Sequence, residues 1–224
     1  MFRGMFKHWR VFGLAALLML AAGCATGSRE PRNLDALKAE VRDYVTSGKY
    51  QGEIAAVAAQ ADAWIVERAE RRTPGERLAM VFDLDETLLS NLPFMLDEDF
   101  GGTDAAWNAW MGSGKDPAIE PVRELYRRAR RLGVDVIFLT GRHARIRAAT
   151  EKNLRDIGCA DYAELICRPD DSKGPAAAFK TAERQRLTAE GRVIIANIGD
   201  QESDRAGGYA ERTFKLPDPF YFTP

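Results

Sequence analysis

The stretch Met80–Asn91, MVFDLDETLLSN, decides the fold. An apolar run from Leu78 to Phe82 leads into two carboxylates, Asp83 and Asp85. A buried strand that ends in acids is typical of the edge where an open α/β sheet binds ligands. Residues two apart on a strand point to the same side, so the two carboxylates converge if the extended geometry lasts through both. The alternative is a solvated loop with two acids, since a lone Asp-x-Asp arises often by chance.

Apolar runs of strand length recur along the chain, and segments with helical spacing lie between them. The strands are predicted at 78–82, 134–139, 162–167 and 193–198. Helices are predicted at 34–45, 51–72, 121–132 and 144–157, with a loop and then a helix over 173–190, whereas 93–102 is expected to be a loop. This alternation predicts an α/β fold with a parallel sheet flanked by helices.

Polar residues follow three of these strands directly. Thr140, Gly141 and Arg142 end the second strand, and Asp200 and Asp204 follow the fourth. The carboxyl ends of parallel strands lie on one edge, so these groups should gather with the first two acids. A hydroxyl, a glycine N–H and a basic side chain before a helix N-terminus suit an anionic ligand such as phosphate.

Four carboxylates brought close together repel one another, and a bound cation relieves that repulsion. All-oxygen ligands favour Mg²⁺. A zinc site is not expected, because His143 has no ligand partner visible in the sequence. A metal, a hydroxyl, backbone amides and a lysine together form a phosphate site, and one aspartate is then free to attack phosphorus.

The N-terminus has the order of a secretory signal. Basic residues (Arg3, Lys7 and Arg10) precede the apolar segment 11–22, which is too short for a comfortable bilayer span. The segment LAAGC, ending at Cys24, resembles the bacterial lipobox, with Ala21 where Leu is most usual. We expect residues 1–23 to be a lipoprotein signal peptide, Cys24 to be lipidated and 24–33 to be a tether. An ordinary cleaved signal or an uncleaved anchor is the alternative.

This anchor implies attachment to a membrane of the bacterial cell envelope. Ala25 is not the aspartate that retains many lipoproteins at the inner membrane, so the protein is expected at the outer membrane, facing the periplasm. Removal of the signal takes away three basic residues and moves the formal charge from −1 to −4. No basic face for a nucleic acid polymer is expected. Cys159 and Cys167 remain, and a disulfide between them stays open, since its geometry cannot be read from sequence.

The motifs DLDET, FLTGR, Lys180 and IGDQESD, in this order, resemble the four motifs of the haloacid dehalogenase (HAD) superfamily of phosphohydrolases. Within this superfamily, the sequence resembles the branch that contains the acid phosphatases related to plant vegetative storage proteins and the bacterial acid phosphatase lipoproteins. Further matching stretches are FDLDETLLSNLPF, TEKNL at 150–154 and RTFKLPDPF at 212–220. The resemblance runs from about Tyr44 to the C-terminus. It implies a Rossmann-like sheet with a small helical cap, placed at about 92–121 within the domain 34–224.

The resemblance also implies roles for the site residues. Asp83 is the expected nucleophile and Asp85 the expected general acid and base. Mg²⁺ would be held by the Asp83 carboxylate, the Asp85 backbone carbonyl and the Asp200 carboxylate, with Asp204 acting through water or from behind these ligands. The phosphoryl group would be held by Thr140, Gly141 and Lys180, with Lys173 as a competitor for the lysine role.

The expected function is therefore a Mg²⁺-dependent acid phosphatase that hydrolyses small phosphomonoesters through an aspartyl-phosphate; whether nucleotides are among its substrates stays open. A catalytically silent ester-binding or storage lipoprotein on the same fold is the alternative, and retention of Asp83 and Asp85 counts against it. Dehalogenation or phosphomutase transfer is a third possibility. Trp107 and Trp110 lie three apart, on one face of a predicted cap helix, where packing is the first interpretation and stacking on substrate the second. The natural substrate and the oligomeric state are not determined by the sequence.

Overall fold

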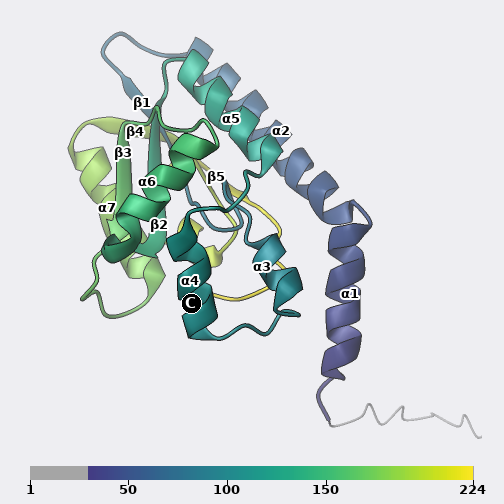
Figure 1. Cartoon of the computed structure of the whole chain (residues 1–224). Helices are drawn as coiled ribbons and strands as arrows, with labels where there is room; N and C mark the ends of the chain where they lie inside the picture. Colours follow the sequence, from purple (N-terminus) through teal and green to yellow (C-terminus); the bar gives the residue numbers. More distant parts are fainter. Residues whose placement is uncertain (1–29, 224) are drawn as a thin grey trace, which may run out of the picture. The chain divides into compact units, whose positions relative to one another are not determined.

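The computed structural model describes residues 30–223, and five parallel strands form the centre of its fold (Figure 1). The strand order is β3-β2-β1-β4-β5. The strands are β1 (Arg77–Phe82), β2 (Asp135–His143), β3 (Glu164–Arg168), β4 (Arg192–Gly199) and β5 (Arg212–Lys215). The predicted α/β fold with a parallel sheet is confirmed. Because β1 is central, Asp83 leaves the sheet between its two neighbouring strands.

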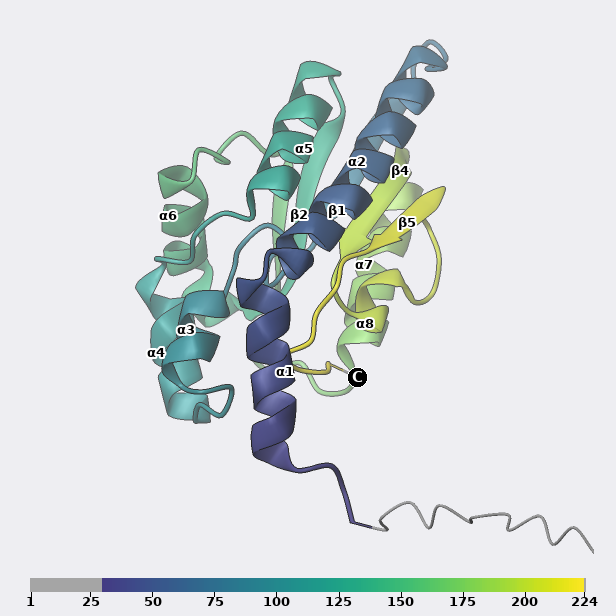
Figure 2. The same ribbon diagram turned by 90° about the vertical axis from the view of Figure 1, so that its right-hand side faces the viewer.

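Helices cover both faces of the sheet, and the alternation of side chains along β1 explains why. Met80 and Phe82 belong to the larger core, whereas Ala79 and Val81 belong to the smaller one. The larger core includes residues of α2 (Lys49–Glu70), α5 (Glu120–Arg131) and α6 (Arg147–Asp156), and the smaller includes residues of α7 (Ala176–Ala189). Figure 2 shows α2 and α5 side by side across one face.

Two sequence expectations were wrong in detail. The segment expected to be a loop at 93–102 contains the helix α3 (Leu92–Asp97), because Pro93 lies in the first turn, where its missing N–H removes no helical hydrogen bond. The edge strand β5 was not foreseen, since its four residues, RTFK, carry only one buried side chain. The second strand also continues past Leu139 as far as His143.

The remaining elements are short or lie at the edges of the domain. They are α1 (Leu34–Thr46), α4 (Asp104–Ser113), the 3-10 helix η1 (Ala144–Ile146) and α8 (Glu202–Arg205). Thr103 caps α4 by accepting a hydrogen bond from the Ala106 N–H at 3.2 Å, and Gly114 ends the helix in the left-handed conformation. The segment 92–121 thus holds α3 and α4, while the division of the chain into signal, tether, domain and cap stays a prediction.

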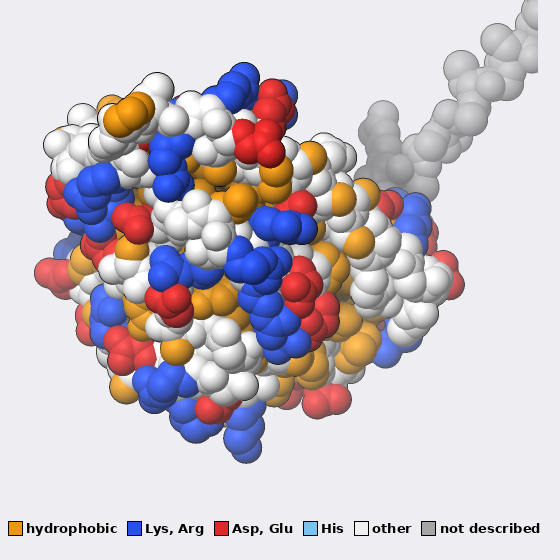
Figure 3. Space-filling view, turned by 90° about the horizontal axis from the view of Figure 1, so that it is seen from above, with side chains coloured by type: hydrophobic (Ala, Val, Ile, Leu, Met, Phe, Trp, Pro, Cys, Tyr) orange, Lys and Arg blue, Asp and Glu red, His pale blue; other side chains and the backbone are white. Residues whose placement is uncertain are grey.

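Most arginines of the basic face of α5, which the sequence predicted to be a solvated face, form ion pairs. Arg127 pairs with Glu124 in the same helix, and Arg128 pairs with Asp62 of α2 at 3.1 Å. Viewed from above, Lys and Arg side chains lie interspersed with Asp and Glu (Figure 3). Most positive charges of this helix are therefore neutralised by nearby acids.

The signal peptide, the lipidation site Cys24 and most of the tether lie outside the described residues. Within residues 30–223, no helix combines the length and apolar character that crossing a bilayer requires. Cys159 and Cys167 are both buried free thiols, so the disulfide that the sequence left open is not formed.

Candidate active site

A cavity of about 550 Å³ opens where the sheet edge meets α3 and α4. Three of the predicted acids line it: Asp83, Asp85 and Asp200. Aromatic side chains line it as well, from both the segment between β1 and α5 and the C-terminal segment: Phe94, Phe100, Trp107, Phe220 and Tyr221. The cavity therefore combines a strongly acidic region with apolar walls, which is typical of a small-molecule site.

Asp83 is held in line with the sheet. Its backbone N–H donates to the Ile198 carbonyl of β4 at 3.0 Å, so the extended geometry continues one residue past β1. The chain then turns, because the Leu84 carbonyl accepts from the amides of Leu88 at 2.9 Å and Leu89 at 2.8 Å. Asp83 and Asp85 both line the cavity, as predicted, but the turn between them directs their carboxylates to different cations.

The cation that faces Asp83 is Lys180 of α7. Its ammonium group donates to Asp83 Oδ1 at 2.7 Å and also to Asp204 Oδ1. All three side chains are less than a tenth exposed. Lys173, the competing lysine, is exposed and is not among the residues that line the cavity. The structure thus brings Lys180 to the carboxylates.

Asp200 completes this group of acids. It accepts from the Thr87 hydroxyl at 3.2 Å and from the Gln201 side-chain amide at 2.6 Å. Carboxylate oxygens of Asp83, Asp200 and Asp204 lie within 4.8 Å of one another, and all three residues are buried. Asp204 is therefore close enough to be a direct ligand, although the sequence assigned it a place behind the ligands.

The buried acids resist ionisation together. Burial, together with the nearby Asp204 and Asp85 carboxylates, raises the pKa of Asp83 to about 7 against the attraction of Lys180. Burial also raises the pKa of Asp200 well above its ordinary value, with Asp83 and Asp204 adding to the effect. Burial opposes the charged form of Lys180, but the two carboxylates beside it hold its pKa above the usual value.

This group of carboxylates fits a divalent cation. Three buried oxygens of like charge at short range, paired with a single lysine, leave negative charge that a hard cation would neutralise. The donor set contains no sulfur or imidazole, which disfavours zinc. The observed geometry supports a divalent metal site among Asp83, Asp200 and Asp204.

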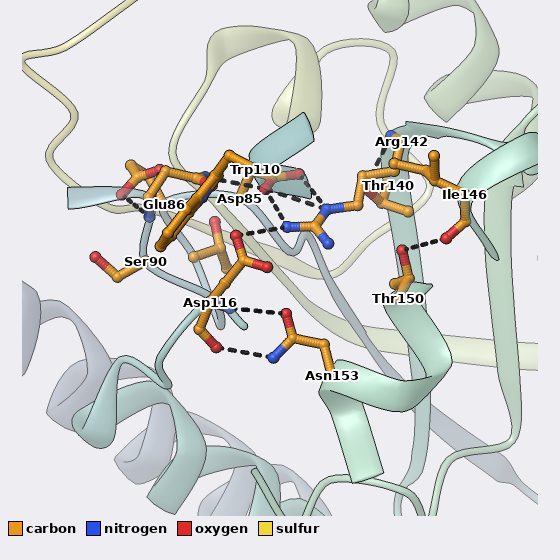
Figure 4. Close-up of polar contacts among 12 residues, drawn as sticks. Asp85, Glu86, Ser90, Trp110, Asp116, Thr140, Arg142, Ile146, Thr150 and Asn153 are labelled. Atoms are coloured by element: carbon orange, nitrogen blue, oxygen red, sulfur yellow. Dashed lines mark hydrogen bonds and ion pairs between the residues drawn. The ribbon is translucent and has the colours of Figure 1, made fainter. Parts of the chain in front are cut away.

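Asp85 faces a different cation, the guanidinium of Arg142 (Figure 4). Arg142 Nη2 donates to Asp85 Oδ1 at 2.7 Å, and its Nε donates to Oδ2 at 3.0 Å. The same guanidinium lies 3.3 Å from Asp116 Oδ1. Burial acts to raise the pKa of Asp85, but Arg142 and a hydrogen bond from Asn91 hold it below its ordinary value.

Of the two phosphate-binding residues predicted at the end of the second strand, one lines the cavity and the other lies behind it. Gly141 lines the cavity, whereas Thr140 is fully buried and does not. The Thr140 hydroxyl oxygen accepts from the Arg142 N–H at 3.0 Å. Arg142 itself has its charge taken by Asp85 and Asp116, so it is not the free basic side chain that the Thr-Gly-Arg pattern suggested.

Several residues of the site were missed from the sequence. Asp116 and Asn91 have no motif of their own, and only the structure shows that they contact the Asp85–Arg142 pair. Asn91 lies within the matching stretch after the first strand, which is the one signal that could have drawn attention to it. Glu86 is fully buried against Asn91, and burial raises its pKa to about 8.

The fold and the site together define the class. A buried aspartate at the end of the central strand, a lysine paired with it, and a cluster of acids from the fourth strand form the arrangement expected of an α/β phosphohydrolase. A family model for the HAD superfamily, subfamily IIIB (acid phosphatase), matches residues 26–224. The chain belongs to this family, and its class of activity is that of a phosphomonoesterase.

Individual relatives agree with this assignment. Acid phosphatase 1 of Solanum lycopersicum is 37% identical over 189 residues, which cover 81% of this chain and 72% of that protein. Vegetative storage protein 1 of Arabidopsis thaliana is 32% identical over 192 residues, covering 84% and 70%. The solved structure of the class C acid phosphatase from Bacillus anthracis shares the fold, with a TM-score of 0.70 and 21% identity over 84% of this chain and 86% of that one.

Proposed function

We propose that this protein is a Mg²⁺-dependent acid phosphatase that hydrolyses small phosphomonoesters through an aspartyl-phosphate on Asp83. The observation that carries the proposal is the meeting of Asp83, Lys180 and Asp200 at the wall of one cavity, in a chain of the acid phosphatase family. Mg²⁺ would be held by Asp83 and Asp200, together with the Asp85 carbonyl or the Asp204 carboxylate. When bound, it would neutralise charge on the phosphoryl oxygens.

In the first step, a carboxylate oxygen of Asp83 bonds to phosphorus while the bond from phosphorus to the ester oxygen breaks. The alcohol oxygen keeps that electron pair and takes a proton from Asp85. In the second step, Asp85 takes a proton from water, whose oxygen bonds to phosphorus. The bond from phosphorus to Asp83 breaks, inorganic phosphate leaves and Asp83 regains its carboxylate.

Residues around the cavity would support these steps. Lys180 would balance the charge of the phosphoryl group, and the Gly141 N–H would donate to one of its oxygens, with Thr140 supporting the turn from beneath. The aromatic walls would hold the apolar part of the ester and limit the access of water. The requirement for a protonated Asp85, whose pKa is held low, favours activity in acid as long as bound Mg²⁺ keeps Asp83 ionised.

The test is phosphate release from p-nitrophenyl phosphate and a panel of nucleoside monophosphates, with Mg²⁺ and with EDTA. We expect turnover that needs the divalent cation and returns when Mg²⁺ is restored. Turnover unaffected by the chelator would refute the metal assignment. No turnover from a folded protein under any condition would favour the second candidate, a storage-type binding protein, which the similarity to vegetative storage protein 1 makes worth testing.

We also propose that the N-terminus carries a lipid anchor on Cys24 and that the protein lies at the outer membrane, facing the periplasm. The support is the order of basic, apolar and small residues before LAAGC. Mass spectrometry of the mature protein tests it: the expected N-terminal residue is an acylated Cys24. An unmodified N-terminus at another residue would refute the lipid anchor.

A further inference from the structure

The side chain of Trp110, in α4, is connected to Asp85 through one intermediate residue. Its indole N–H donates to Asn91 Oδ1 at 2.8 Å, and Asn91 Nδ2 donates to Asp85 Oδ1 at 3.0 Å. An indole nitrogen is only a donor, so the amide must present its oxygen to Trp110 and its NH₂ group to the carboxylate. Trp110 therefore fixes the amide oxygen, and the carboxylates that accept from Asn91 Nδ2 require the same orientation.

Neither residue lines the cavity that holds the acids. Asn91 is fully buried, and its NH₂ group also donates to Glu86 Oε2 at 2.7 Å. Trp110 stacks on Phe94, with ring centroids 6.0 Å apart, whereas Trp107 of the same helix lines the cavity. Trp110 is thus placed to act on the carboxylate rather than on the ester.

The two oxygens of Asp85 are held unequally (Figure 4). Oδ1 accepts from Asn91 and from Arg142 Nη2, at 3.0 and 2.7 Å. Within the described part of the chain, the contact at Oδ2 comes from Arg142 Nε alone, at 3.0 Å. Oδ2 is therefore the oxygen with room for a proton, and the contacts at Oδ1 fix the rotamer that presents it.

We propose that Trp110 and Asn91 are positioning residues that fix the Asp85 carboxylate for proton transfer to the leaving alcohol. The inference rests on the proposed function, since it takes Asp85 as the general acid. It also gives α4 two tasks. Trp107 forms part of the cavity wall, and Trp110, one turn further on, holds the acid in place.

Proton transfer matters in proportion to the basicity of the leaving group. An alkoxide needs a proton as the bond to phosphorus breaks, whereas p-nitrophenolate departs without one. The quantity kcat/KM covers the steps up to departure of the alcohol. Comparing glycerol 2-phosphate with p-nitrophenyl phosphate thus isolates the acid from general damage to the site.

The first variant is Trp110→Phe, which keeps a stacking ring and removes the N–H. We expect kcat/KM for glycerol 2-phosphate to fall about tenfold, and that for p-nitrophenyl phosphate to stay within about twofold, in keeping with one lost hydrogen bond. Trp107→Phe in the same helix is the matched control. It should not lower the value for glycerol 2-phosphate more than that for p-nitrophenyl phosphate, because Trp107 lines the cavity without a contact to Asn91.

The second variant guards against a folding defect in the first. Asn91→Ser keeps a residue favoured before a helix, here α3, but is too short to connect Trp110 with Asp85. It should show the same separation between the two substrates. Equal losses for both substrates in both variants would overturn the inference.

Asp85→Asn separates this inference from the function on which it rests. The variant keeps the backbone carbonyl and loses the acid, so it should show the largest separation between the two substrates. If it does and the two positioning variants do not, the positioning role is wrong and the proposed mechanism stands. If Asp85→Asn treats both substrates alike, Asp85 is not the general acid, and both conclusions fail.

Discussion

Two aspartates on either side of Leu84 are treated in opposite ways by the fold. Asp83 pairs with Lys180, yet burial and neighbouring acids raise its pKa to about 7. Asp85 is paired twice by the fork of Arg142, which together with Asn91 holds its pKa low. The difference lies in the third acid, Asp200, beside the Asp83–Lys180 pair and in the geometry of the donor.

On one side of the site three acids lie around one cation, and on the other side two acids share one cation. Lys180 serves Asp83 and Asp204 while Asp200 lies close by, so this side fits an additional cation. Arg142 has Asp85 and Asp116 as partners, and the pKa of Asp116 is raised by burial despite Arg142. The first side therefore suits metal-dependent chemistry, and the second suits the placing of a carboxylate.

The largest effect should come from Asp83→Asn. The amide has nearly the same shape but cannot attack phosphorus, so phosphate release should fall by about 10⁴-fold or more. Phosphate release from p-nitrophenyl phosphate measures it, and Asp97→Asn on the exposed side of α3 serves as the control. Activity retained by Asp83→Asn would mean that another group is the nucleophile.

Replacing each cation in turn distinguishes the two sides of the site by its effect on the free energy of unfolding. Arg142→Met leaves a buried carboxylate pair without its partner and should lower the free energy of unfolding by about 3–5 kcal/mol. Lys180→Met should also destabilise the protein, but Mg²⁺ should restore much of that loss, because the surplus charge lies among metal ligands. Thermal unfolding with and without Mg²⁺ measures both. Equal rescue of the two variants would contradict the distinction.

The pH dependence of metal binding sharpens the comparison further. Asp83, with a pKa of about 7, is increasingly protonated below that pH and must lose its proton when the metal binds. Mg²⁺ affinity should fall by about tenfold per pH unit from pH 7 to pH 5. Titration calorimetry in two buffers measures the affinity and the released proton. An affinity independent of pH over this range would show that Asp83 is already ionised.

The raised pKa of Asp83 also makes the stability of the metal-free protein depend on pH. Because the folded-state pKa of Asp83 lies above its unfolded value, its contribution to stability is present below about pH 4 and is lost as the pH rises to about 7. Stabilisation by Mg²⁺ should therefore be larger at pH 7 than at pH 5. Asp85 runs the other way, since its pKa is lowered, so its contribution is present near neutrality and is lost in acid.

The smallest effect should follow from Asp116→Asn. The substitution keeps the backbone contacts with Asn153, at 3.1 and 2.8 Å, and removes only the 3.3 Å ion pair with Arg142. The loss of unfolding free energy should be about 1 kcal/mol, since Arg142 keeps its hydrogen bonds with Asp85. Chemical denaturation measures it. A loss as large as that of Arg142→Met would mean that the stability of this site depends on the Asp116–Arg142 ion pair rather than on the Asp85–Arg142 pair.

Four of the five strands, the acids that follow two of them and the lysine of α7 could be predicted from the sequence. Apolar runs before Asp83 and Asp200 identify buried strands, and parallel strands place their ends on one edge. This local pattern sufficed for the α/β fold, whereas the preference for Lys180 over Lys173 came from the resemblance to the HAD superfamily. The helix α3 and the strand β5 were missed because each is short and lacks a clear hydrophobic period.

Tertiary structure alone decided which charge meets which. Asp83 and Asp85 are near-identical in sequence context, yet the turn after Leu84 sends one to α7 and the other to β2. Asp116 lies 31 residues from Asp85 and Trp110 lies 19 residues from Asn91, and no periodic pattern links either pair. Local sequence fixes secondary structure through backbone geometry and burial, whereas a buried charge pair depends on distance in space, which only the packed fold sets.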